Sequence, residues 1–189
     1  MTAVADGLEG VFTLPDFRIL YPEDSAATRF RKLEDLIGAG ELVRIKRGVY
    51  ARPDADLRRV SQRITPDSFL SLGTVLAEEG LIGSIPGRRV WAVVRGRPRR
   101  YSCPLGTVEH VSMAPRLQFG WEVKNGLRKA VPEKAWLDAM YLSYKGRQLS
   151  FDPLEDVDWG RLDRARWTEY LAEYEPRFQK QLLHHLDEA

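Results

Sequence analysis

The feature that most constrains this chain is a short segment, GELVRIKRGVYARP, in which two apolar strands meet at a turn glycine. The segment covers residues 40–53 and gathers four cations around Gly48. Apolar runs on either side of such a turn predict a β-hairpin with one buried face. The residues just before it, 25–38, place Phe30 and Leu33 among apolar residues at helical spacing, which predicts an amphipathic helix.

A shorter helix is expected before this one in the chain, separated from it by a tight turn. Thr13 is a suitable N-cap, Pro15 suits an early helical position, and Pro22 ends the helix. The next helix is expected to begin with Asp24 or Ser25 as its cap. The order is therefore helix, tight turn, second helix and basic hairpin. This is the order of a winged helix-turn-helix.

In a winged helix the second helix enters the DNA major groove and the hairpin lies beside it. Residues 25–52 hold seven basic and three acidic side chains, so this unit carries a local positive charge. The residues expected to contact double-stranded DNA are Ser25, Thr28, Arg29, Arg31 and Lys32 on the helix, and Arg44, Lys46 and Arg47 on the hairpin. Winged helices also serve as protein-interaction modules, and the sequence leaves that alternative open.

The expected fold class is α+β, with an N-terminal winged helix-turn-helix in residues 1–56 and an α+β domain in 57–189 that has a small, mostly antiparallel sheet. The elements expected in the second domain are a helix in 65–80, a buried strand at 90–94, a strand within 106–115, a hairpin at Asn125-Gly126, and helices at 132–145, 159–173 and 176–186.

A second basic segment lies in the middle of the chain. Residues 88–101 contain six arginines and no acidic residue, and Gly96 and Pro98 predict a loop there. A candidate second basic patch, suited to the phosphate backbone, consists of Arg95, Arg97, Arg99 and Arg100. The alternatives are that these arginines solvate a hairpin or bind the acidic C-terminal helices.

No catalytic residue, metal ligand or cofactor is expected. Glu133, Lys134 and Asp138 hint at a nuclease, but Glu133 and Asp138 lie about 140° apart around one helix and do not readily share a metal. We expect Glu133 to cap the helix, with an exposed ion pair beside it. His110 is expected to be a satisfied structural histidine, and Cys103 lacks a basic partner typical of a nucleophile.

Composition indicates a soluble, cytoplasmic protein. The single cysteine excludes an internal disulfide and fits a reducing compartment. The first ten residues do not resemble a secretory signal, and no apolar run reaches the length of a membrane helix. The net charge is only +2, but positive charge concentrates in the middle of the chain and negative charge toward its end.

Four segments in succession resemble the AbiEi family of antitoxins from bacterial abortive-infection, type IV toxin-antitoxin systems. They are VFTLPDF, LEDLIGAGELVRIKRGVYA, SFLSLGTVLAEEGLI and AVPEKAWLDAMYL, and together they cover roughly residues 11–142. The resemblance implies a winged helix that binds inverted repeats in its own promoter and represses the operon. It also implies a C-terminal domain that counters a nucleotidyltransferase-like toxin, typically without a stable complex.

The chain departs from this family pattern in two places. Only about ten residues precede VFTLPDF, so the helix expected before it must be short or replaced by another element. The acidic, tryptophan-rich tail after residue 150 lies outside the resemblance, and its role stays open.

Overall fold

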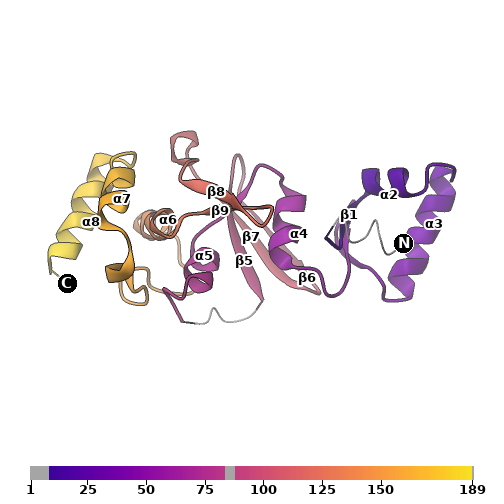
Figure 1. Ribbon diagram of the computed structural model, residues 1–189, viewed down its shortest axis with the longest axis horizontal. Coiled ribbons are helices and arrows are strands. Elements are labelled where there is room, and N and C mark those ends of the chain that lie inside the picture. Colours follow the sequence, from indigo (N-terminus) through magenta and orange to yellow (C-terminus); the bar gives the residue numbers. More distant parts are fainter. Residues whose placement is uncertain (1–8, 84–87, 189) are drawn as a thin grey trace.

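The computed structural model describes residues 9–83 and 88–188. Figure 1 shows a small unit of helices and strands at one end, a larger sheet in the middle, and α7 and α8 at the other end. The fold is α+β, as expected. Among the helices of the described residues, none is both long enough and apolar enough to cross a membrane.

The N-terminal unit contains the expected helices and hairpin. Its elements are β1 (Val11–Thr13), α2 (Leu14–Leu20), α3 (Ala26–Gly38), β2 (Val43–Lys46) and β3 (Val49–Ala51). The strands form a small antiparallel sheet in the order β1-β3-β2. Its core is a cluster of buried side chains: Phe12, Phe17, Leu33, Leu42 and Tyr50.

Local capping explains where the two N-terminal helices begin. The backbone N–H and the hydroxyl of Thr13 both donate to Asp16 Oδ2 at 2.6 Å, which fixes the first turn of α2. At the start of α3, Ser25 Oγ accepts a hydrogen bond from the Thr28 N–H at 3.1 Å. The cap at Thr13 agrees with the sequence prediction, and of the two residues expected as the second cap, Asp24 and Ser25, the structure has Ser25.

The second part is built on a six-stranded sheet. Its elements are α4 (Leu57–Ile64), β4 (Phe69–Leu70), α5 (Gly73–Glu78), β5 (Arg89–Val94), β6 (Arg99–Cys103), β7 (Gly106–Ser112), β8 (Trp121–Lys124), β9 (Leu127–Ala130) and α6 (Pro132–Tyr144). The strand order is β6-β7-β5-β4-β9-β8. The pairs β5–β7 and β4–β9 are parallel and the pairs β4–β5, β6–β7 and β8–β9 are antiparallel, so the sheet is mixed, with antiparallel pairs in the majority. The pair β5–β7 is parallel because β6 lies outside β7, so that β7 returns alongside β5 in the same direction.

The prediction of a long helix in residues 65–80 is wrong for the first half of that segment. Phe69 and Leu70 instead form β4, which lies between β5 and β9, and the helix covers only Gly73–Glu78. Leu72 separates the two elements with a φ of 52°, a backbone conformation that a leucine rarely adopts. Phe69, Leu70 and Leu72 are all buried, as is typical of a strand in the interior of a sheet. The pairing with β5 and β9 therefore overrides the helical pattern of this segment.

The C-terminal tail packs against α6. It contains α7 (Arg164–Leu171) and α8 (Pro176–Glu188), preceded by a short 3₁₀ turn at Trp159–Arg161 where a longer helix was expected. Trp167 meets the buried Trp136 edge-on, with ring centroids 5.6 Å apart. The tail therefore completes the main core rather than standing free.

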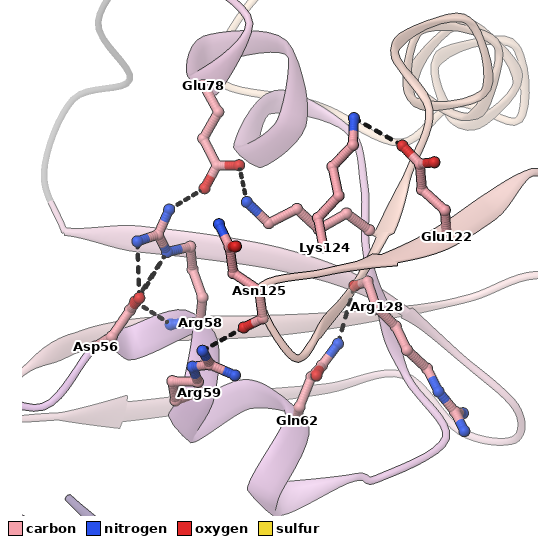
Figure 2. Close-up of polar contacts among 10 residues, drawn as sticks. Asp56, Arg58, Arg59, Gln62, Glu78, Glu122, Lys124, Asn125 and Arg128 are labelled. Carbon is pink, nitrogen blue, oxygen red and sulfur yellow. Dashed lines mark hydrogen bonds and ion pairs between the residues drawn. The ribbon is translucent and has the colours of Figure 1, made fainter. Parts of the chain in front are cut away.

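Helix α4 joins the two parts of the molecule. An apolar cluster crosses the expected boundary between residues 56 and 57 and contains Val11, Ile45, Val49, Ala51, Val60, Leu105 and Val108. Figure 2 shows polar contacts on the other side of α4, where Arg58 pairs with Asp56 at 2.7 Å and Gln62 donates to the Arg128 carbonyl at 2.9 Å. The face of the N-terminal sheet that lacks α2 and α3 is thus covered by α4, which follows the sheet in sequence.

Candidate nucleic-acid interface

The first turn of α3 presents two hydroxyl groups. The side chains of Ser25 and Thr28 are exposed and lie 2.8 Å apart, within hydrogen-bond distance of each other. Hydroxyls at the N-terminal end of a helix can contact base edges or phosphate oxygens. Both residues therefore lie exposed at the start of α3, and their contact with DNA stays a prediction.

Two other residues predicted to contact DNA hold the connection between α2 and α3. Arg29 is half-buried and donates from Nη1 to the carbonyl oxygens of Tyr21, at 3.0 Å, and Asp24. Lys32 forms an ion pair with Asp24 at 2.6 Å and lies 4.5 Å from the ring centre of Tyr21. Their roles as DNA contacts stay predictions, and the structure adds a role in fixing this turn.

Arg31 is placed differently from Arg29. It lies about 160° around the helix from Arg29 and points away from the core. Its side chain is exposed and forms no ion pair within the part of the chain that the structure describes. Arg31 is therefore the cation on α3 that is most available to an external anion.

The hairpin carries two further exposed cations, Arg44 on β2 and Arg47 in the turn, which also lack an ion pair among the described residues. Gly48 allows the tight turn with a φ of 81°, and its carbonyl accepts a hydrogen bond from the Leu14 N–H at 3.3 Å. The cationic turn is thus fixed beside the start of α2.

Lys46 points instead toward the second sheet. It is half-buried, and its Nζ lies 5.7 Å from the ring centre of Tyr101 on β6. Of the eight residues predicted to contact DNA, the exposed ones without a hydrogen bond or ion pair to another described residue are therefore Arg31, Arg44 and Arg47.

The second basic patch lies on an edge of the six-stranded sheet. Arg95 and Arg97 are in the turn between β5 and β6, while Arg99 and Arg100 are on β6, the edge strand. All four side chains are exposed, and none is in an ion pair with another described residue. Arg99 lies two residues from Tyr101, so the patch begins close to the contact with Lys46.

A third group of cations lines a hollow of about 430 Å³ beside α4. Each of its arginines already has a carboxylate partner: Arg59 pairs with Glu9 at 2.8 Å, Arg63 with Asp16 at 2.6 Å, and Arg128 with Asp67 at 3.4 Å. Figure 2 shows Arg59 reaching the carbonyl of Asn125 as well. These arginines join elements of the fold and offer little free charge to a ligand.

The ion pair expected to be exposed on α6 is instead buried. Lys134 and Asp138 have no exposed surface, and Asp138 also accepts hydrogen bonds from Ser71 at 2.8 Å and Tyr174 at 2.9 Å. Burial lowers the pKa of Lys134, and the attraction of Asp138 opposes that shift. The expectation of an exposed pair was wrong because distant aromatic residues enclose it.

Glu133 was expected to cap its own helix, but α6 has no side-chain cap, and Glu133 contacts the start of α7 instead. It is buried, and it accepts hydrogen bonds from the Asp163 N–H at 3.1 Å and from Arg166 at 3.4 Å. Glu133 therefore holds the start of α7 against α6. These contacts support the structural interpretation of the acidic and basic residues on α6.

The remaining candidates for chemistry have structural partners. His110 is buried, and its Nε2 lies 3.1 Å from Ser61 Oγ, while burial lowers its pKa to about 4. The Cys103 thiol donates to the Gly106 carbonyl at 3.3 Å. No cluster of three metal-binding side chains occurs in residues 9–83 and 88–188.

The sequence did not predict an apolar hollow between α2 and α3. We call it the α2–α3 groove and define it by Leu14, Phe17, Ala26, Phe30 and Leu33; Arg18 and Arg29 also line it. Phe30 belongs to the apolar face of α3, yet 59% of its surface is exposed.

Comparison with protein-family models finds no match to this chain, and comparison with curated proteins finds no significant similarity.

Proposed function

We propose that this chain is a sequence-specific DNA-binding protein whose N-terminal unit acts as a winged helix. The observation that carries the proposal is the presence, on α3 and on the adjoining hairpin, of exposed cations with no ion-pair partner among the described residues: Arg31, Arg44 and Arg47. Arginines of this kind can neutralise phosphates on a duplex and release counterions. The order of helices and strands in the unit supports the same conclusion.

We assign the DNA-contacting residues to two groups. Arg31, with Ser25 and Thr28, lies at the exposed side of α3 and suits contacts with base edges or nearby phosphates. Arg44 and Arg47 lie on the hairpin and suit contacts with the phosphate backbone. Arg29 and Lys32 act mainly by holding the turn that positions α3.

The biological role that we propose is an antitoxin and autorepressor of a type IV toxin-antitoxin operon. Its support is the resemblance of residues 11–142 to AbiEi antitoxins, together with the succession of a small helical unit and an α+β part. The helix that the family pattern puts before β1 would fall outside the described residues, and α4 covers a different surface, the sheet at β1 and β3. The toxin countered is a nucleotidyltransferase-like enzyme.

A gel-shift titration tests DNA binding. The probes are the duplex upstream of the chain's own gene and a scrambled duplex of equal length, each measured at several salt concentrations. We expect tighter binding to the upstream duplex, and a loss of binding to both when Arg31, Arg44 and Arg47 are all replaced by alanine. Equal affinity for both duplexes would argue against sequence specificity.

The matched control replaces Arg164, Arg177 and Lys180, three exposed cations of the C-terminal helices, with alanine. This variant removes the same charge from the opposite end of the molecule and should bind DNA as the parent does. The antitoxin role has its own test. Expression of the chain should restore growth of cells that produce the nucleotidyltransferase-like toxin encoded beside it, and failure to do so would refute that role alone.

A second candidate function, a protein-interaction module, is favoured by a separate observation. The α2–α3 groove leaves apolar side chains exposed on the same unit. Surfaces of this kind commonly bind proteins. DNA binding that is absent at all salt concentrations would make this the leading function.

A further inference from the structure

Exposed apolar side chains concentrate on the N-terminal unit. Among the described residues, the large apolar side chains with substantial exposure are Leu14, Ile19, Phe30, Trp121, Val123 and Leu183. Three of these lie on α2 and α3, and Ile19 and Phe30 are 77% and 59% exposed. A concentration of this kind on so small a unit marks a surface that is normally covered.

The surface is concave. The α2–α3 groove has a volume of about 420 Å³. A second hollow, of about 490 Å³, shares Arg18 and Arg29 with it and extends the apolar surface to Pro15, Ile19 and Pro22. The two hollows together run along the junction of α2 and α3, which lie side by side in Figure 1.

The shape suits a helix. Three-helix forms of the helix-turn-helix pack a further helix against the pair. Here α4 packs on the sheet at β1 and β3, and no residue of α4 lines the groove. Within the described residues, the side of α2 and α3 that a third helix would cover is therefore open.

The charge of the groove selects among occupants. Its lining contains two arginines and no acidic residue in the described part of the chain. The guanidinium of Arg29 is held by the carbonyls of Tyr21 and Asp24, so its position is fixed. A second copy of this chain, packed symmetrically, would bring the same arginines together, which disfavours self-association through this face.

We propose that the α2–α3 groove is a docking site for an amphipathic helix with acidic flanks, contributed by a partner protein. Two or three apolar side chains of that helix, spaced by three or four residues, enter between Leu14 and Phe30. Its carboxylates face Arg18 and Arg29. This site is distinct from the exposed cations Arg31, Arg44 and Arg47, and it does not depend on DNA binding.

The test uses a pair of hydrocarbon-stapled helical peptides of about 16 residues. Both have leucines along one face; one has glutamates on the flanks and the other has lysines. Fluorescence anisotropy measures their binding to the full chain. We expect the glutamate peptide to bind about tenfold or more tightly than the lysine peptide.

Three variants locate the binding site. Phe30→Ser should weaken the binding of the glutamate peptide about tenfold, because it removes the main apolar contact. Arg18→Glu should reverse the preference between the two peptides. Leu183→Ser removes an exposed leucine from α8, at the far end of the molecule, and should change neither affinity. Circular dichroism checks that each variant is folded. If Phe30→Ser does not fold, Arg18→Glu still tests the proposal, because Arg18 is exposed.

Four outcomes would overturn the proposal. The first is no saturable binding of the glutamate peptide, and the second is equal affinity for both peptides. The third is a dimer in sedimentation that Phe30→Ser dissociates, which would make a second copy the occupant. The fourth is a loss of DNA affinity in Phe30→Ser as large as that in Arg31→Ala, which would make the groove part of the duplex interface.

Discussion

Arg29 donates a hydrogen bond from Nη1 to the backbone carbonyl of Tyr21, 3.0 Å away, and so ties α3 to the segment that precedes it. Arg31, only two residues later, lies on the opposite side of the helix and is exposed. The two arginines therefore have separable roles, one inside the unit and one at its surface.

The first prediction compares these two arginines. Arg31→Ala should weaken DNA binding by about 1–3 kcal/mol, while its free energy of unfolding changes by less than about 0.5 kcal/mol. Arg29→Ala should lower the free energy of unfolding by about 1 kcal/mol or more, because the carbonyls of Tyr21 and Asp24 each lose a hydrogen bond from a charged donor. Gel shifts and urea unfolding measure the two effects. A large loss of DNA affinity in Arg29→Ala at unchanged stability would contradict the assignment.

The second prediction concerns the hairpin. Arg44→Ala and Arg47→Ala should each lower the affinity for the upstream and the scrambled duplex by the same factor, since phosphate contacts carry no sequence information. Each change should also reduce the slope of log affinity against log salt by about 1. Arg177→Ala, on α8, is the control and should leave the slope unchanged. A loss confined to the upstream duplex would instead indicate base contact by the hairpin.

The third prediction concerns the buried pair on α6. Lys134→Met should lower the free energy of unfolding by about 3–5 kcal/mol, because Asp138 would remain buried without a cation. The double variant Lys134→Met/Asp138→Leu should recover most of that loss, since no buried charge then remains. Urea unfolding measures both. Equal destabilisation of the single and double variants would show that packing, rather than charge, dominates at this site.

The fourth prediction concerns pH. Burial lowers the pKa of His110 from 6.5 to about 4 in the folded protein. Between these values the unfolded chain binds a proton that the folded protein does not, so the free energy of unfolding should fall as pH decreases from 6.5 to 4. His110→Gln cannot titrate and should flatten this part of the curve. Urea unfolding between pH 4 and 7 measures it, and an unchanged slope would assign the effect to other groups.

Elements with local signals were predicted well from the sequence. The helix that begins after Ser25, the turn at Gly48 and the helix that begins at Pro132 each depend on residues a few positions apart. Strand β4 was missed because its partners, β5 and β9, are distant in sequence. A pattern of apolar residues at 69–76 fits a helix until those neighbours are known.

The same distinction applies to the candidate site. The exposure of Arg31, Arg44 and Arg47 follows from helical and strand periodicity, so the sequence could predict it. The binding of Lys32 to Asp24 could not be predicted, because it depends on how the turn between the helices is oriented. Nor could the burial of Lys134, which is enclosed by Tyr174 from the far end of the chain.

The position of α4 has a consequence for the history of the chain. Val60 on this helix packs with Val11 and Ala51 from one part and with Val108 from the other, so each part supplies an inner surface to its neighbour. In a polypeptide that ended at residue 56, one apolar face of the N-terminal sheet would be exposed to solvent. Recombination that exchanged only the N-terminal unit among related genes would have to keep the apolar surface that this unit shares with α4. We therefore expect the two parts of the chain to be inherited together.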